Sequence, residues 1–131
     1  MKEKSKHRQL VEYFYEVSKS ARGFKPIVTA KDAGQLKRIL ELEILSVNEI
    51  EMLMLYFLAD VSYRNLGPSI ATMMSSTVLN SLINKLRNRA KFYRELEGYM
   101  RHLPKKQGFK VSKDIDKKIN DLISKLTINK K

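Results

Sequence analysis

The chain has 131 residues, a length that suits a single domain with a hydrophobic core and is short for two such domains. It contains no cysteine, which excludes disulfides, thiolate metal sites and cysteine nucleophiles and fits a reducing compartment such as the cytoplasm. Its 26 Lys and Arg residues against 14 Asp and Glu residues give a net charge of +12, and an excess of this size attracts polyanions.

The helical spacing of apolar residues predicts a first helix over residues 6–21, and Gly23 supplies its stop. Thr29 then has the side chain of a helix cap, and Asp32 stands three residues later, where a carboxylate favours the helix dipole. We therefore expect a second helix that begins after Thr29 and reaches about Leu42.

A third helix is predicted over about residues 47–61, preceded by the capping box of Ser46 and Glu49. Its residues are apolar nearly all the way round, which is typical of the buried central helix of a bundle. A fourth helix is expected over residues 68–88, with Pro68 in the first turn, where proline is tolerated best.

The end of the chain contains two more helical segments. The first ends at Pro104 and either continues the fourth helix or is separated from it near Ala90. Residues 104–111 form a predicted basic linker, and Ser112 can cap the final helix.

These elements predict an all-α fold, because no segment shows the alternating apolar pattern of a strand. We expect one domain over residues 1–131, a compact bundle of five to six helices around the apolar helix at 47–61, with frayed ends at 1–5 and 127–131. No window approaches the roughly 20 apolar residues of a membrane-spanning helix, so we expect a soluble protein without a membrane partner. The narrow apolar stripe of the last helix could pack within one chain or against a second copy, so an oligomer remains an alternative.

The charge is divided into three blocks along the chain. Residues 1–40 and 85–131 carry net charges of +6 and +10, whereas residues 41–84 carry −4. The acidic block has no aspartate-rich ligand pattern, and we interpret it as a solvated or partner-facing surface rather than a metal site. Its acidic residues are Glu41, Glu43, Glu49, Glu51 and Asp60.

The predicted fourth helix carries an unusual polar stripe, with a short hydrogen-bonding side chain at every fourth residue. These residues are Thr72, Ser76, Asn80, Asn84 and Asn88. Solvated helix faces usually carry Lys, Glu, Gln and Arg, which have higher helix propensity. The stripe runs into cations suited to phosphate contacts, namely Lys85, Arg87, Arg89, Lys91 and Arg94, with Lys105 and Lys106 further on. We therefore predict a nucleic-acid-binding site here, while helix packing, a shallow protein interface and plain solvent exposure remain open.

Groups that carry out catalysis are scarce. The two histidines, His7 and His102, have no carboxylate at a spacing that suggests a metal pair, and there is no glycine-rich phosphate loop. We expect no enzymatic activity, no catalytic residue, no bound metal and no cofactor.

Three segments carry a resemblance to a known group of proteins. They are Thr29–Leu40, Glu49–Leu53 and Tyr56–Asp60, within residues 24–90. A Lys-Asp-x-x-x-Leu-Lys-x-Leu-like helix followed by an acidic and apolar helix resembles modules of phage and mobile-element replication proteins, of the replisome-organiser and helicase-loader type. The resemblance implies binding to origin DNA or to a helicase or its loader, with no reaction of its own. A winged-helix domain, often joined to such modules, is not evident in the sequence, which puts sequence-specific origin recognition in doubt.

The sequence thus favours a non-enzymatic nucleic-acid-binding accessory protein, with DNA rather than RNA as its ligand, in the DNA replication of a phage or mobile element. The alternative is a protein-interaction adaptor or inhibitor that is basic because its partner is acidic and that does not contact DNA. A steep loss of DNA affinity with salt would support the first hypothesis, because each phosphate contact releases counterions.

Overall fold

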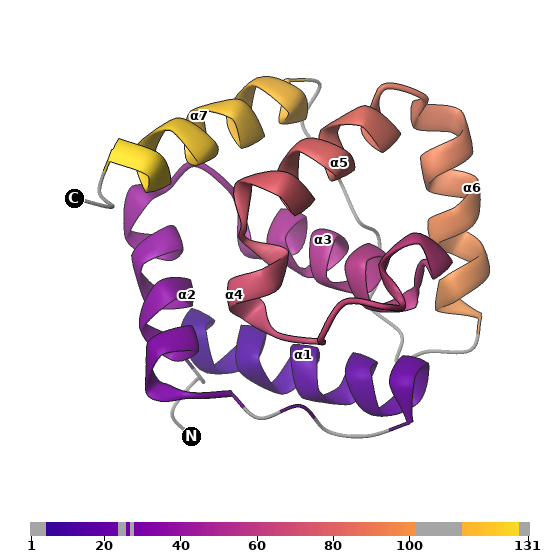
Figure 1. The fold of residues 1–131 in the computed structure, drawn as a ribbon, viewed down its shortest axis with the longest axis horizontal. Helices are drawn as coiled ribbons and strands as arrows, with labels where there is room; N and C mark the ends of the chain where they lie inside the picture. The colour runs from indigo at the N-terminus through magenta and orange to yellow at the C-terminus, as the bar shows by residue number, and fades with distance from the viewer. Residues whose placement is uncertain (1–4, 24–25, 27, 102–113, 129–131) are drawn as a thin grey trace.

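The computed structural model describes residues 5–23, 26, 28–101 and 114–128, and this part of the chain contains helices and loops but no strand (Figure 1). The elements, in chain order, are α1 (Lys6–Arg22), α2 (Ala30–Leu42), α3 (Val47–Ala59), the 3-10 helix η1 (Val61–Tyr63), α4 (Ile70–Met73), α5 (Ser76–Leu86), α6 (Arg89–Met100) and α7 (Ile115–Ile128). The prediction of an all-α bundle is confirmed.

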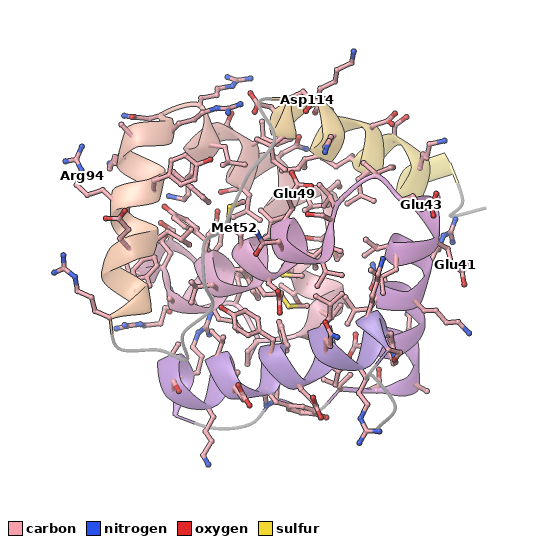
Figure 2. The ribbon with its side chains drawn as sticks, turned by 180° about the vertical axis from the view of Figure 1, so that it is seen from behind. Glu41, Glu43, Glu49, Met52, Arg94 and Asp114 are labelled. Carbon is pink, nitrogen blue, oxygen red and sulfur yellow. The ribbon has the colours of Figure 1, made fainter. Side chains whose placement is uncertain are left out.

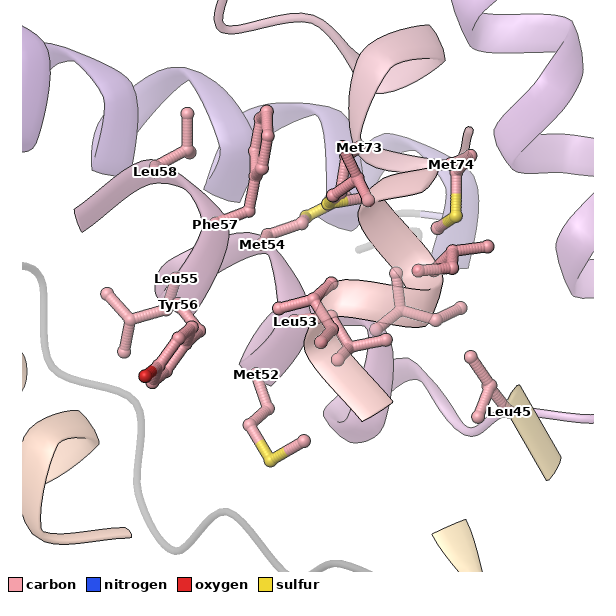
Figure 3. Close-up of a cluster of buried hydrophobic side chains, with 14 of the residues drawn as sticks. Leu45, Met52, Leu53, Met54, Leu55, Tyr56, Phe57, Leu58, Met73 and Met74 are labelled. Atoms are coloured by element: carbon pink, nitrogen blue, oxygen red, sulfur yellow. The ribbon is translucent and has the colours of Figure 1, made fainter. Parts of the chain in front are cut away.

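Helix α3 forms the centre of this bundle, as its apolar sequence predicts. Every residue from Glu49 to Leu58 is buried. The helix packs against α1 and α6, while α2 packs against α1 and α4, and α5 packs against α6 and α7. Figure 3 shows the side chains from Met52 to Leu58 spread around α3 toward its neighbours. The helix ends at Ala59, two residues before the predicted end, because the backbone of Asp60 is extended.

Aromatic rings join α3 to α6. Tyr56 stacks on Phe92 with ring centroids 4.3 Å apart, and the ring of Tyr99 meets Tyr56 edge-on at 5.8 Å. Such pairs contribute about 0.5–1.5 kcal/mol each beyond the area they bury. These contacts fix the position of α6, which carries part of the predicted nucleic-acid site.

The predicted start and stop signals of the early helices are present. Thr29 and Asp32 form a reciprocal capping box at α2, and Ser46 and Glu49 form another at α3. Gly23 ends α1 in the left-handed conformation, with a φ of 83°, which glycine adopts without steric cost. Local cap chemistry therefore sets these boundaries.

The prediction of one helix over residues 68–88 is wrong. The chain forms two helices there, α4 and α5, separated at Met74 and Ser75. The Ser75 hydroxyl accepts a hydrogen bond from the backbone N–H of Val78 and donates one to the carbonyl of Thr72. A serine bonded in this way offers the backbone an alternative to a continuous helix. Because of this break, the described residues contain seven α-helices rather than five to six. Pro68 precedes the cap of α4 instead of lying in its first turn.

Arg22, at the end of α1, holds the connection that follows α3. Its guanidinium donates four hydrogen bonds of 2.8–3.2 Å to backbone carbonyls of Leu58, Tyr63, Arg64 and Leu66. Burial, followed by the charge of Arg64, lowers the pKa of Arg22 from its usual value. The contacts fix the turn that borders the site described below.

Helix α7 is docked on α5 through a narrow apolar stripe, as its three-four spacing predicts. Ile115, Ile119 and Leu122 are fully buried. Two ion pairs flank the stripe: Lys118 Nζ lies 3.5 Å from Glu49 Oε1, and Arg89 Nη2 lies 3.1 Å from Asp116 Oδ1. In this structure the stripe is used within one chain.

Some predicted features lie outside the described residues. These are the linker at 104–111, the Ser112 cap, and the chain ends at 1–4 and 129–131. Ser5 is the last residue of the range 1–5 that was predicted to be frayed. Its hydroxyl accepts a hydrogen bond from the N–H of Arg8 and caps α1.

Candidate nucleic-acid interface

A group of cations gathers where α5 ends and α6 begins. This basic corner consists of Lys85, Arg87, Arg89, Lys91 and Arg94, and residues 85–101 contain six basic residues against two acidic ones. The first turn of α6 carries Arg89 and Lys91 and no acidic residue. Cations at the positive end of a helix dipole destabilise the helix unless an anion is present. The corner therefore has the electrostatic character of an anion-binding surface.

The five cations of the basic corner have different partners. Arg89 is paired with Asp116, and Lys85 lies 3.8 Å from Asp60, as described below. Arg87, Lys91 and Arg94 are exposed and form no ion pair within the described part of the chain. Figure 2 shows Arg94 directed outward from α6. These three side chains are the ones available to a polyanion.

The polar stripe does not form one continuous row, because the helix breaks at Ser75. Ser76, Asn80 and Asn84 lie exposed on α5, whereas Thr72 belongs to α4 and accepts a hydrogen bond of 2.7 Å from the Ser69 hydroxyl. Only Ser76, Asn80 and Asn84 can act together on one helix face. Thr72 is better explained by the local hydrogen bonds at the start of α4.

Asn88, the last member of the stripe, caps α6. Its Oδ1 accepts a hydrogen bond of 3.3 Å from the backbone N–H of Lys91. The last residue of the stripe is therefore the cap of the helix that carries part of the basic corner. Lys105 and Lys106, also predicted to bind nucleic acid, lie outside the described residues.

Beside the basic corner lies an open polar groove with a volume of about 480 Å³. It runs between the turn after α3 and the junction of α5 with α6, and its main polar residues are Asp60, Ser62, Ser81, Asn84, Lys85, Asn88, Lys91 and Glu95. Of the predicted site residues, the structure brings Asn84, Lys85 and Lys91 together here.

The floor of the groove is a hydrogen-bonded network around Asp60, which is only 3% exposed. The Tyr99 hydroxyl donates to Oδ1 of this carboxylate, and the backbone N–H of Ser62 donates to Oδ2 at 3.1 Å. Lys85 Nζ lies 3.8 Å from Oδ2 and donates to the Ser62 hydroxyl at 3.1 Å. Lys85 is thereby held against the groove.

The same network favours the ionised form of Asp60. Burial alone would raise the pKa of this carboxyl group, but the hydrogen bonds from Tyr99 and Ser62 and the charge of Lys85 outweigh burial and lower it. Conversely, burial, followed by the hydrogen bond to Asp60 and its charge, raises the pKa of the Tyr99 hydroxyl, which stays protonated. The network contains a carboxylate, a neutral phenol and an ammonium group.

The interpretation of the acidic block as one solvated surface is wrong for three of its five members. Glu49, Glu51 and Asp60 are buried, with exposures of 2%, 3% and 3%. Figure 2 shows Glu49 at the start of α3 within the molecule, whereas Glu41 and Glu43 lie at its rim. Glu49 is part of a capping box and an ion pair, and Asp60 caps the 3-10 helix. Glu49 and Asp60 thus stabilise local structure instead of forming a solvated surface.

Sequence reasoning did not find Ser62, Ser81 or Glu95 as parts of the site. Glu95 Oε1 accepts a hydrogen bond of 3.1 Å from the Tyr56 hydroxyl, and Ser81 and Tyr63 share one of 2.9 Å. The contributing segments are far apart in the chain, and no spacing signal links them. They come together because α6 packs against α3 and α5, and because the Tyr63–Ser81 hydrogen bond joins α5 to the turn after α3.

Within the described ranges, no group of three or more His, Asp or Glu side chains could hold a metal ion. None of the helices in those ranges combines the length and apolar character required to cross a membrane.

Comparisons of the chain with protein-family models, curated proteins and solved structures found no match.

Proposed function

We propose that this protein is a non-enzymatic nucleic-acid-binding protein that holds the phosphate backbone at the basic corner. The observation that supports this most directly is the set of exposed cations Arg87, Lys91 and Arg94 around the first turns of α6. Backbone phosphates are the polyanion that such clustered arginine and lysine side chains bind most readily. The resemblance to replication accessory modules favours DNA as the nucleic acid and the replication of a phage or mobile element as the process.

The neighbouring amides and hydroxyls of α5 add a second element to the proposal. Ser76, Asn80 and Asn84 would face sugars or base edges next to the phosphates held by the corner. The pairing of Arg89 with Asp116 makes Arg89 less available, so it contributes less to binding than Arg87 does.

The test is a binding titration of fluorescently labelled single-stranded and duplex DNA, followed by anisotropy at several salt concentrations. The triple variant Arg87→Glu, Lys91→Glu, Arg94→Glu should lose most of its affinity. With duplex DNA, the slope of log K against log salt should become shallower by roughly 0.9 for each phosphate that the variant no longer neutralises.

The matched control reverses three exposed lysines far from the basic corner: Lys6→Glu, Lys31→Glu and Lys37→Glu on α1 and α2. Figure 1 shows that α2 and the start of α1 lie at the opposite edge of the molecule from α6. This variant has the same net charge as the corner variant. Equal losses of affinity in the two variants would mean that net charge, not the corner, binds DNA.

The same cations would also bind acidic side chains, and a protein adaptor is the second candidate function. Within residues 41–84, the burial of Glu49, Glu51 and Asp60 leaves Glu41 and Glu43 as the exposed acidic residues. The basic corner is therefore the surface that would bind an acidic partner protein. DNA titrations that stay blank at low salt, together with a protein complex that the corner variant abolishes, would replace nucleic acid by an acidic protein as the target.

A further inference from the structure

The groove beside the basic corner offers more hydrogen-bond donors than acceptors. Its two carboxylates are already engaged: Asp60 accepts from Tyr99 and Ser62, and Glu95 accepts from Tyr56. Asp60 is also almost completely buried beneath the groove. A ligand in the groove would therefore meet few acceptors that are not already in use.

The groove also contains hydrogen-bond donors that remain available to a ligand. The carbonyl oxygen of the Asn88 side chain accepts from a backbone N–H, which leaves its NH2 group to donate outward. The Ser62 hydroxyl accepts from Lys85 and is itself hydrogen-bonded to Asp60, so it belongs to the floor of the groove rather than to its available donors. Asn84 and Lys91 are exposed at the rim and add an amide and an ammonium group. Donors from α5, from its junction with α6 and from the first turn of α6 thus converge on one open space.

We infer that the groove seats one phosphodiester group of a nucleic-acid backbone, and this inference rests on the proposed function. A phosphodiester presents oxygens that accept several hydrogen bonds at once, which matches the donors of Asn84, Asn88 and Lys91. The volume of about 480 Å³ lies within the range of roughly 300–1,000 Å³ typical of small-ligand sites, so a phosphate with part of its nucleoside fits.

The charges of the groove select the singly charged diester over a doubly charged phosphomonoester. The lining contains two lysines and two carboxylates, and Lys85 is already held beside Asp60. The two lysines and the two carboxylates cancel in charge, so the second negative charge of a monoester gains no net attraction, whereas a diester keeps the oxygens that the donors bind. Inorganic phosphate should consequently bind more weakly than a dinucleotide with one diester and no terminal phosphate.

The first experiment compares Asn84→Ala with Asn120→Ala in the DNA titration. Both residues are exposed on helices, but Asn84 lines the groove, whereas Asn120 lies on α7, outside the proposed binding surface. Loss of one donor to a charged phosphate should weaken binding about tenfold for Asn84→Ala. Asn120→Ala should bind like the wild type, and both variants should keep the wild-type salt slope because no charge is removed.

The second experiment follows the side-chain NH2 signals of the asparagines by NMR while the dinucleotide, inorganic phosphate or unphosphorylated thymidine is added. The inference predicts shifts of the Asn84 and Asn88 signals with the dinucleotide, smaller shifts with inorganic phosphate and none with thymidine.

The outcomes separate the two proposals. If DNA binds through the basic corner but Asn84→Ala and Asn120→Ala bind it equally well, the groove inference is wrong and the proposed function stands. If DNA does not bind while the dinucleotide shifts the groove amides, the proposed function is wrong and the groove still holds a phosphodiester. Shifts spread evenly over all exposed asparagines would overturn the groove inference.

Discussion

The Arg22 side chain is placed where no other natural side chain could make the same contacts. It binds four carbonyls that belong to the end of α3 and the turn after it. Several carbonyl dipoles converge on one point there, and a guanidinium group can satisfy them from a single plane. Arg22 thus ties the turn to α1, while the Asp60 cap and the backbone hydrogen bonds of η1 hold the turn itself.

Arg22→Lys is expected to lower the free energy of unfolding by about 2 kcal/mol, because an ammonium group cannot reach all of these carbonyls and leaves some of them without a partner. Urea denaturation measures this change. Arg8→Lys is the control, since Arg8 is an exposed residue of the same helix whose surface ion pair with Glu12 contributes little. Equal stabilities of the two variants would show that water replaces the Arg22 contacts without cost.

At the scale of the elements, helix boundaries follow from serine and threonine side chains. Ser5, Thr29, Ser46, Ser69 and Ser75 each accept a hydrogen bond from the first turn of the helix that they precede. The last of these separates α4 from α5 and so divides the predicted polar stripe. Because the apolar spacing of residues 68–88 continues across the Ser75 cap, the sequence predicts one helix where the chain forms two.

Ser75→Ala removes the cap of α5 and should destabilise the protein by about 1 kcal/mol. Ser76→Ala changes the next residue, which is exposed in the first turn of α5, and should stay within about 0.5 kcal/mol of the wild type. Thermal unfolding monitored by circular dichroism compares the two. A larger effect at Ser76 would show that the break does not depend on the Ser75 hydroxyl.

Local signals in the sequence were sufficient for much of the fold. The starts of α2 and α3 follow from capping boxes, and the central place of α3 follows from its apolar surface. The groove could not be predicted, because Asp60, Ser81 and Glu95 meet only when α5 and α6 pack beside the end of α3. Charge counting also misplaced Asp60, since the sequence does not show that Tyr99 and Ser62 donate hydrogen bonds that compensate its burial.

At the scale of the whole molecule, stability should depend on acid through the network at the groove floor. The folded-state pKa of Asp60 is lowered, so the native state holds this carboxyl group ionised more strongly than the unfolded chain does. Its contribution to stability is therefore complete above the unfolded pKa of about 3.9 and is lost as the pH falls through the lower folded pKa.

Asp60→Asn should lower the free energy of unfolding at neutral pH by about 1–3 kcal/mol, because Lys85 and Tyr99 lose their charged partner. Its unfolding free energy should also fall less steeply below about pH 4 than that of the wild type. Urea denaturation across this pH range measures both effects. Asp121→Asn, on the exposed face of α7, is the control with the same charge change. Parallel pH profiles for Asp60→Asn and the wild type would contradict the assigned role of Asp60.

The burial of α3 from Glu49 to Leu58 also has a consequence during synthesis of the protein. The ring of Tyr56 is covered by Phe92 and Tyr99, which are translated more than thirty residues later. Until α6 has left the ribosome, one side of the most apolar helix has no cover, and exposed apolar surface of this kind favours aggregation and chaperone binding. The nascent chain can thus bury this side of α3 only late in synthesis, when α6, the helix that carries much of the basic corner, packs against it.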